Sequence, residues 1–302
     1  MQGIVSKSTG SWYKVILPSG EEVDARLRGK IRTLDIKSTN PVVVGDEVVL
    51  DFVEKEYSIK EIVDRKNCIV RKSNKLSKQF QIIAANIDHA FLIASPAKPH
   101  TPQGFIDRFL VTAEAYQIPV SILLNKSDLD TKKANAHREM LMKLYPSIGY
   151  NIHNFSFLEA KDIAKIKELV AEKCILLAGN SGVGKSTLIN ALIPDSNQKV
   201  SAISKSYDKG RHTTTFAQMF VGANGCRIID TPGIKDFGLV NIEPNQVSHY
   251  FPEMSKLLHG CKFSNCLHTE EPECKVLEAL EQETISITRY VNYLGILEEV
   301  TK

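Results

Sequence analysis

The sequence lacks any long apolar run. None of its hydrophobic stretches approaches the roughly 20 residues that a membrane-spanning helix needs, and its N-terminal stretch, MQGIVSKSTG, lacks the apolar core of a secretory signal. No internal repeat or low-complexity segment is visible. We therefore expect a cytoplasmic protein that does not associate with membranes, and its 302 residues can hold two or three domains.

A large net charge is also absent, because 38 Lys and Arg residues nearly balance 35 Asp and Glu residues. The charges are nevertheless distributed unevenly. Six basic residues and no acidic residue lie between Arg65 and Lys78, whereas acids outnumber bases by ten to five from Asn241 to Lys302. A basic segment beside a β-rich domain favours a polyanionic partner, although a solvated surface loop would have the same composition.

Cysteines are few, and three of the six cluster near the C-terminus. Cys261, Cys266 and Cys274 occur with His268 in the pattern C-x4-C-x-H-x5-C. Three thiolates and one imidazole form a closed set of the kind that holds a structural Zn²⁺, and a reducing cytoplasm favours metal over disulfides. A segment this small has little core of its own, so the metal would supply much of its folding energy.

A glycine-rich loop in the middle of the chain predicts a phosphate site. Gly179–Ser186 matches the P-loop pattern G-x-x-x-x-G-K-[ST], with an apolar strand before it and a helical run after it. The glycines let backbone N–H groups surround phosphate oxygens, Lys185 can reach the β- and γ-phosphates, and Ser186 can ligate Mg²⁺. The expected phosphate-binding residues are Gly179, Asn180, Ser181, Gly182, Val183, Gly184, Lys185, Ser186 and Thr187.

A second motif predicts that the nucleotide carries guanine. Asn125, Lys126, Ser127 and Asp128 match N-K-x-D directly after an apolar strand. The Asp128 carboxylate can accept hydrogen bonds from guanine N1–H and the 2-amino group, while Asn125 would lie near O6 and N7 and the Lys126 stem along the base. Adenine lacks both donors and would leave a buried carboxylate unpaired, at a cost of about 1–3 kcal/mol.

Two further elements complete a predicted Mg²⁺-dependent switch. In the D-x-x-G element Asp230 to Gly233, Asp230 would hold Mg²⁺ through a water and the Gly233 N–H would contact the γ-phosphate. The segment Gly210–Thr215 supplies a threonine that would complete the Mg²⁺ shell only when the γ-phosphate is present. We assign this role to Thr214, with Thr215 as the alternative that spacing does not exclude.

The residue after the D-x-x-G element predicts slow intrinsic hydrolysis. Ras-like enzymes use a glutamine there to position the attacking water, and Ile234 cannot do so. His212 is the candidate to orient the water once the switch closes, and Lys185 and Thr214 are the other expected catalytic residues. A purely structural histidine is the alternative for His212.

The predicted elements indicate a multidomain fold in four parts. Residues 1–67 hold short strands separated by turn residues, which is typical of a small OB-fold β-barrel. A basic linker is expected at 68–84. Alternating strands and helices in 85–240 predict a mostly parallel α/β domain, and residues 241–302 would form a helical zinc-binding domain.

Capping residues and helical spacing predict the main helices. A helix that begins at Pro102 would have Thr101 as its N-cap. Its residues Phe105, Phe109, Ala113 and Tyr116 recur at helical spacing, which predicts a stripe that faces the core. Further helices are expected at 131–145, 159–172, 244–258 and 276–298.

The order of the nucleotide motifs is unusual. Ordinary GTPases run from the P-loop through the switch threonine and D-x-x-G to N-K-x-D, whereas here N-K-x-D comes first, followed by the P-loop, Thr214 and Asp230. The same sheet can form if the chain is circularly permuted. The segment after D-x-x-G then leads directly into the C-terminal domain, which would receive the change in nucleotide state.

The barrel, the permuted motifs and the Cys/His cluster together resemble the ribosome small-subunit-dependent GTPase A family (RsgA, also called YjeQ). The resemblance covers essentially the whole chain. The family's G-R-H-T-T-T sequence stands unchanged at Gly210–Thr215, and its Ala-Asn-x-Asp stretch stands at Ala85–Asp88. For the guanine-side S-A-K motif, Ser156 is the candidate.

The resemblance implies a GTPase that is stimulated by the small ribosomal subunit and acts in its late maturation or quality control. GTP or GDP, Mg²⁺ and one structural Zn²⁺ would be its cofactors, and the small subunit with its ribosomal RNA would be its partner. We expect a monomer, because nothing in the sequence indicates an obligate dimer. The alternative is a zinc-containing RNA-binding scaffold protein in which the GTP site only holds structure; turnover measurements would distinguish the two.

Overall fold

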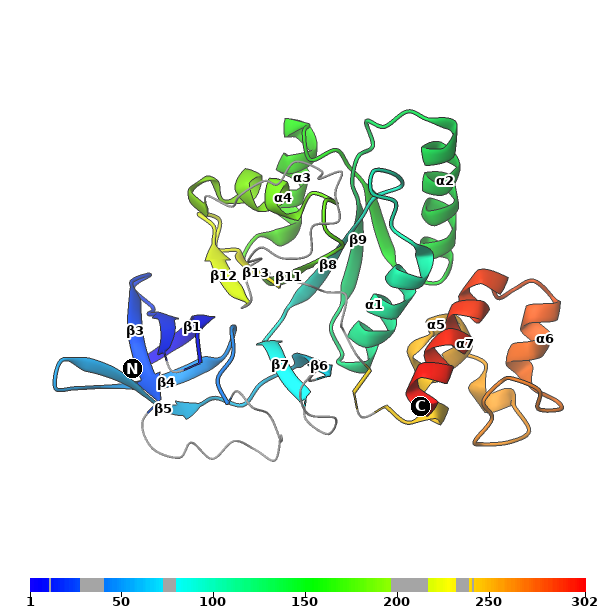
Figure 1. Cartoon of the computed structure of the whole chain (residues 1–302), viewed down its shortest axis with the longest axis horizontal. Helices are drawn as coiled ribbons and strands as arrows, with labels where there is room; N and C mark the ends of the chain where they lie inside the picture. Colours follow the sequence, from blue (N-terminus) through cyan, green and yellow to red (C-terminus); the bar gives the residue numbers. More distant parts are fainter. Residues whose placement is uncertain (11, 28–40, 73–79, 197–216, 232–238, 241) are drawn as a thin grey trace.

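The computed structural model describes residues 1–10, 12–27, 41–72, 80–196, 217–231, 239–240 and 242–302. The N-terminal part is a closed five-stranded barrel, at the left of Figure 1. Its strands are β1 (Gln2–Ser8), β2 (Trp12–Ile16), β3 (Glu22–Leu27), β4 (Glu47–Val53) and β5 (Glu56–Ile62). The ring runs β1-β2-β3-β5-β4 and closes where β4 pairs with β1, which confirms the predicted OB-type barrel.

Alternating side chains fill the barrel, as the period of a strand requires. Tyr13 and Val15 of β2 point inward and pack with Val48 and Ile59 in one buried core, while the alternate residues Trp12 and Lys14 face out. The hydrophobic residues that made this region predictable as strands therefore form the barrel interior.

The central domain is a mostly parallel sheet with helices on both faces. Its strand order is β10-β9-β8-β11-β13-β12, and only β12 runs antiparallel to its neighbour β13. The strands are β8 (His89–Ala94), β9 (Val120–Leu124), β10 (Asn151–Asn154), β11 (Cys174–Ala178), β12 (Gln218–Val221) and β13 (Arg227–Asp230). The helices are α1 (Gln103–Ala115), α2 (Lys132–Ser147), α3 (Ala160–Val170), α4 (Lys185–Leu192) and the short 3-10 helix η1 (Pro194–Ser196).

The two faces of this sheet carry separate cores. Phe109 of α1 and Leu141 of α2 pack on one face, whereas Ile166 of α3 and Leu188 of α4 pack on the other. Figure 1 shows the two helix pairs on opposite sides of the sheet. The predicted α/β domain is thus confirmed. It was predictable because parallel strands that are buried on both faces appear as continuous apolar runs in the sequence.

The start of α1 differs from the prediction in its cap. The N-cap residue is Pro102, and no side chain caps the helix. The Thr101 hydroxyl instead accepts a hydrogen bond from the Ser95 N–H at 2.9 Å, so Thr101 as N-cap is wrong: its side chain satisfies the turn after β8. The predicted core stripe of α1 is confirmed, with Phe109 fully inside and Tyr116 packed at its edge.

The barrel joins the central domain through strand pairing and a polar junction. β1 pairs with β12 at Lys7 and Gln218, so that barrel and central sheet form one eleven-stranded sheet. At the junction, Gly45 has a φ of 92° and a Cβ there would lie 2.1 Å from the Ala85 oxygen. Only glycine fits this approach of the two backbones.

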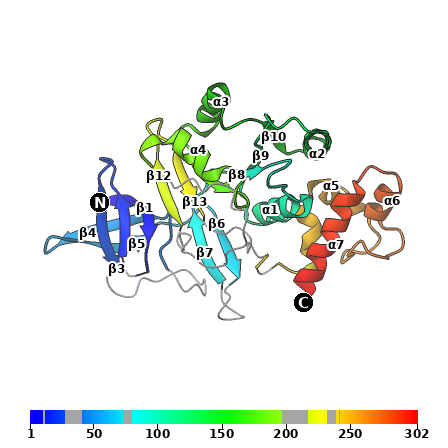
Figure 2. The same cartoon turned by 45° about the horizontal axis from the view of Figure 1, so that its top comes forward.

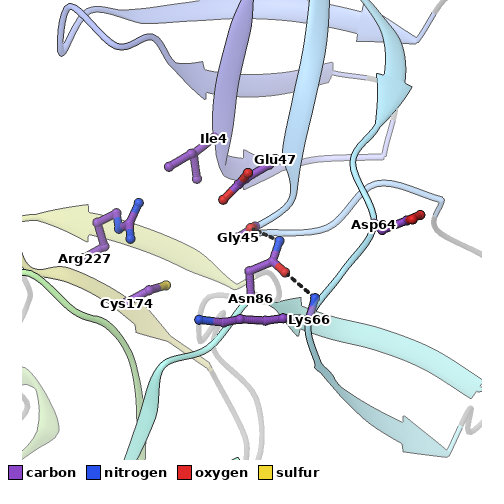
Figure 3. A pocket seen from close by; sticks show the side chains of 8 residues that line it. All are labelled: Ile4, Gly45, Glu47, Asp64, Lys66, Asn86, Cys174 and Arg227. Atoms are coloured by element: carbon purple, nitrogen blue, oxygen red, sulfur yellow. Dashed lines mark hydrogen bonds between the residues drawn. The ribbon is translucent and has the colours of Figure 1, made fainter.

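A cavity of about 150 Å³ lies at the same junction, and Figure 3 shows the side chains that line it. Asn86 crosses it: its amide donates to the Gly45 oxygen at 2.9 Å, and the Lys66 N–H donates to its Oδ1 at 3.0 Å. The neighbouring Arg65 forms a bidentate pair with buried Asp46 at 2.6 and 2.8 Å. The hydrogen bonds of Asn86 therefore fasten the barrel to the central domain across this cavity, and the Arg65–Asp46 pair stabilises the end of the barrel next to it.

A small sheet lies between the barrel and the C-terminal helices (Figure 2). It consists of β6 (Cys68–Lys72) and β7 (Phe80–Ala85), paired antiparallel. The segment 68–84, expected as a basic linker, therefore contains a strand pair. Ile69 and Ala84 of this pair are buried in the same core as α1.

The C-terminal domain is built from short helices. They are η3 (Pro244–Tyr250), α5 (Pro252–Ser255), η4 (Leu258–Gly260), α6 (Lys275–Glu281) and α7 (Ile287–Thr301). The predicted single helix at 244–258 is wrong, because Pro252 has no N–H to continue η3 and begins a new helix. The predicted helix at 276–298 is also interrupted: Glu283 adopts a φ of 55°, and the Thr284 N–H and hydroxyl both donate to the Ala279 oxygen at the end of α6.

A buried ion network holds this domain against the central one. Arg289 of α7 donates to Asp107 of α1 at 2.7 Å and to Glu253 of α5 at 2.6 Å. The Tyr145 hydroxyl of α2 donates to the same Asp107 carboxylate at 2.8 Å. The Arg289–Asp107 pair therefore connects four elements from two domains. Among the described residues, no helix has the length and apolarity to cross a membrane.

Candidate nucleotide site and zinc centre

The glycine-rich loop lies between β11 and α4, at the carboxyl edge of the central sheet. Gly182 and Gly184 both have left-handed backbones, with φ of 80° and 112°. A Cβ on Gly184 would lie 2.5 Å from the Asn125 amide nitrogen. Glycine at this position therefore lets the loop approach the segment that follows β9, at the edge where α/β proteins bind their ligands.

The Lys185 ammonium group folds back over this loop. Its Nζ donates to the Gly179 oxygen at 2.5 Å and lies 3.4 Å from the Asn180 oxygen. Burial lowers the pKa of Lys185, and the nearby Asp230 carboxylate partly opposes this shift. A polyanion at the loop would favour the charged ammonium in the same way, so the side chain is suited to a phosphate ligand.

Asp230, at the end of β13, has an unsatisfied buried oxygen. Its Oδ1 is shielded from solvent and accepts no hydrogen bond from any described residue, and the Thr231 hydroxyl beside it also lacks a described partner. Burial raises the pKa of Asp230, with Lys185 opposing the shift. A carboxylate oxygen without a donor next to a phosphate loop fits a hard cation such as Mg²⁺.

Asn125 connects the N-K-x-D segment to the phosphate loop. Its Nδ2 donates to the Val183 oxygen at 2.8 Å, and its Oδ1 accepts from the Phe157 N–H at 3.0 Å. Lys126 Nζ reaches the Gly182 oxygen at 3.2 Å. Asn125 thus links the N-K-x-D segment to the phosphate loop and to the segment at Phe157.

Asp128 is oriented by Ser156. The Ser156 hydroxyl donates to Asp128 Oδ1 at 2.8 Å, and the Ser156 N–H is held by the Asp162 carboxylate at 2.9 Å. The carboxylate of Asp128 therefore keeps one oxygen without a described protein donor. Two residues on, Leu158 is 79% exposed, the largest exposure of any large hydrophobic residue in the described part of the chain.

The four C-terminal ligand candidates converge in space. The ligand atoms of Cys261, Cys266, His268 and Cys274 all lie within 4.8 Å of one another. His268 Nδ1 is 3.3 Å from Cys274 Sγ and 3.7 Å from Cys261 Sγ. Tetrahedral zinc with Zn–S near 2.3 Å and Zn–N near 2.0 Å separates its ligand atoms by roughly this much, so the donor set and its spacing fit Zn²⁺.

The surrounding chain holds this cluster in place. The Tyr290 and Tyr293 hydroxyls of α7 donate to the His268 and Leu267 oxygens at 2.8 and 2.6 Å. Hydrogen bonds from backbone N–H groups outweigh the effect of burial and lower the pKa of Glu271 to about 2. The ligand loop is therefore supported by α7 as well as by any metal.

Comparison with known proteins identifies the family of this chain. The family model described as RsgA GTPase matches residues 62–240, and the RsgA N-terminal domain matches residues 2–59. The chain belongs to the RsgA family. "Small ribosomal subunit biogenesis GTPase RsgA" of Flavobacterium johnsoniae is 49% identical over 99% of this chain and 93% of its own length. The protein of the same name from Christiangramia forsetii is 48% identical over 99% and 96%.

Solved structures agree with the RsgA assignment and with the permuted order of motifs. The crystal structure of YjeQ from Thermotoga maritima aligns with a TM-score of 0.78 at 32% identity, over 99% of this chain and 98% of that chain. YloQ, described as a circularly permuted GTPase, aligns with a TM-score of 0.75 at 28% identity, over 99% and 94%. The predicted circular permutation is thus confirmed.

Several residues predicted from the switch and D-x-x-G motifs lie outside the described part of the chain. These are the switch segment Gly210–Thr215, with His212, Thr214 and Thr215, and the positions Gly233 and Ile234. The sequence also missed contributors that the structure brings to the site. Leu158 shows no motif, and Arg138, described below, lies on a helix ten residues after Asp128 with nothing in its local pattern to mark it.

Proposed function

We propose that this chain binds and hydrolyses GTP and that it uses this reaction in the biogenesis of the small ribosomal subunit. The observation that carries the proposal is the convergence of the phosphate loop and the N-K-x-D segment. Asn125 and Lys126 donate to the Val183 and Gly182 oxygens of the loop. One edge of the central sheet therefore offers a triphosphate cradle and a base-reading carboxylate at once. The role in small-subunit biogenesis is taken from the names of its relatives.

In this proposal the base is read by Asp128. Ser156 donates to one carboxylate oxygen, and the other oxygen accepts the N1–H and 2-amino groups of guanine. The Lys126 stem covers one face of the base, and exposed Leu158 supplies an apolar contact near it. Burial of an exposed leucine against a base removes apolar surface from water, which favours binding.

The phosphates lie in the glycine-rich loop. Backbone N–H groups from Gly179 to Gly184 and the N-terminus of α4 surround the oxygens, with Ser186 and Thr187 in the first turn of the helix. Lys185 leaves the Gly179 oxygen and turns to the β- and γ-phosphates. This exchange replaces a neutral acceptor with a charged one and strengthens the ammonium hydrogen bond.

Mg²⁺ fits the unsatisfied buried oxygen of Asp230. We propose Ser186 and Thr214 as its ligands, with Asp230 acting through a water. When bound there, the cation would supply positive charge to neutralise the charge that develops on the phosphates. His212 orients the attacking water, since Ile234 cannot, and slow intrinsic turnover follows until a partner closes the switch.

One Zn²⁺ bound by Cys261, Cys266, His268 and Cys274 stabilises the C-terminal domain. All four ligand positions are filled by protein, which suits a structural rather than a catalytic metal. The cluster lies beside the buried contacts of α7, so zinc and Arg289 together hold this domain in its orientation.

The small subunit and its ribosomal RNA are the proposed partner, in the cytoplasm, and the chain acts as a monomer. Trp12 on the outer face of the barrel is 44% exposed, with the Arg26 guanidinium 3.7 Å from its ring centroid. An aromatic ring beside a guanidinium suits contact with nucleic acid. Arg65 is less suited than composition suggested, because it is engaged with Asp46.

The decisive test is a GTPase assay titrated with purified small subunits, large subunits and bare ribosomal RNA. We expect low turnover alone and stimulation by small subunits in excess of the other two. A scaffold protein with a structural GTP site would bind GTP and show no stimulation. Equal stimulation by large subunits would contradict the proposed partner.

A further inference from the structure

Arg138 of α2 contacts the backbone of the proposed guanine-reading segment. Its Nη2 lies 2.9 Å from the Leu129 oxygen, 3.3 Å from the Lys126 oxygen and 3.4 Å from the Ser127 oxygen. Its Nη1 donates to Asn135 Oδ1 at 2.6 Å. One guanidinium thus faces three carbonyl groups that surround Asp128 in the sequence.

The segment needs such support because of its backbone shape. Lys126 has a φ of 67°, a left-handed conformation that is unfavourable for a residue with a side chain. The turn is closed by a Leu129 N–H to Lys126 oxygen bond of 3.1 Å. This turn points several carbonyl oxygens to one side, where their partial negative charges repel each other unless a cation lies among them.

The start of α2 fixes Arg138 in this place. The Thr131 hydroxyl accepts from the Ala134 N–H at 3.2 Å and caps the helix. Asn135, one turn before Arg138, donates to Asp130 at 2.7 Å. The helix, its cap and the turn are therefore one connected unit, and Arg138 is the positively charged group within it that contacts the turn.

We propose that Arg138 is a positioning residue for guanine recognition: it holds the Lys126–Leu129 turn so that Asp128 presents its carboxylate to the base. This inference rests on the proposed function of the turn. Arg138 does not touch the nucleotide in this account. It acts through the backbone, and its loss should affect the reading of the base more than the handling of the phosphates.

The test compares GDP with inosine diphosphate, which lacks the 2-amino group that Asp128 accepts. Dissociation constants would be measured by calorimetry for the wild type, Arg138→Met and Arg138→Lys. We expect Arg138→Met to bind GDP about tenfold more weakly and to lose most of the preference for GDP over inosine diphosphate. Arg138→Lys should recover part of that preference, because an ammonium group can still bond one or two of the carbonyls.

Two further measurements separate positioning from a general structural role. The kcat of Arg138→Met at saturating GTP with small subunits should equal that of the wild type, while KM rises. Arg108→Met is the matched control, since Arg108 also lies on a helix of the central domain but bonds Glu299 at the surface. It should leave the preference for GDP unchanged.

The outcomes are distinguishable. Equal losses of GDP and inosine diphosphate affinity in Arg138→Met, or an unchanged preference in a folded variant, would overturn the inference. Asp128→Asn tests the underlying function and should shift the preference from guanine to xanthine nucleotides. If that shift fails, the assignment of the base-reading segment and the role of Arg138 both fall. If it succeeds while Arg138→Met behaves as the wild type, only the role of Arg138 falls.

Discussion

The buried network around Arg289 allows a quantitative prediction about how the zinc-binding domain is held. Arg289 and Asp107 have fully buried side chains, and Glu253 is 8% exposed. Burial alone would lower the pKa of Arg289, but the charges of Asp107 and Glu253 raise it above its ordinary value. The guanidinium is therefore charged at neutral pH.

Arg289→Met removes this cation and leaves two carboxylates facing each other without a counter-charge. Loss of one partner from a buried ion pair costs about 3–5 kcal/mol. Tyr145 and Asn292 still donate to Asp107, so we expect the lower end, about 3 kcal/mol. The adjacent Arg108 pairs with Glu299 where the side chains are 31% and 46% exposed, and such a pair contributes about 0–1 kcal/mol.

The assay is urea unfolding followed by circular dichroism, with zinc present throughout. Arg289→Met should lower the free energy of unfolding by about 3 kcal/mol and the matched Arg108→Met by less than about 1 kcal/mol. Adding Asp107→Asn and Glu253→Gln to Arg289→Met should recover part of the loss, because no uncompensated charge remains buried. Equal effects of the two arginine variants would refute the reasoning.

Hydrolysis, zinc binding and acid stability each provide a further test. His212→Ala should bind GTP as the wild type does but lose most small-subunit-stimulated turnover, and an unchanged single-turnover rate would exclude the proposed role. The purified chain should carry about one zinc per molecule, and Cys266→Ala should lose it together with part of its helicity; unchanged metal content and helicity would count against the site. Burial would raise the pKa of Asp88, but hydrogen bonds from Lys66 and the Cys174 N–H lower this pKa below its ordinary value of 3.8. The ionised carboxylate therefore stabilises the folded state above pH 3.8, and this stabilisation is lost as the pH falls below that value. The stability difference between the wild type and Asp88→Asn should therefore shrink from about pH 6 to about pH 3, and a constant difference would contradict this.

Local chemistry made much of the fold predictable. Short strands separated by turn residues marked the barrel, and apolar runs such as Cys174–Ala178 marked the parallel sheet. The errors lie where a local preference competed with another contact. Thr101 is a good N-cap residue, yet its hydroxyl accepts from the Ser95 N–H instead. The prediction of one helix over 244–258 did not take into account that Pro252 has no N–H to continue the helix before it.

The candidate site also contains residues that short motifs identify and contacts that only folding creates. Gly184, Asn125 and Asp128 were identified because phosphate and guanine chemistry restrict residue type and spacing within short motifs. Ser156 gave a weak signal, since a single serine without its usual neighbours matches many loops. Only the folded chain brings its hydroxyl to Asp128, 28 residues away.

By itself, the sequence determined the kind of ligand and the order in which its binding elements are arranged. Local chemistry requires glycines where the backbone adopts positive φ, a lysine beside them, and four metal-binding side chains at short spacing. These requirements can be recognised in the sequence. Tertiary structure alone decided how those elements are supported. Arg138 reaches the Lys126–Leu129 turn from a helix, and Arg289 reaches Asp107 across 182 residues of chain. Charge pairing depends on distance in space, and no periodicity along the chain records that distance.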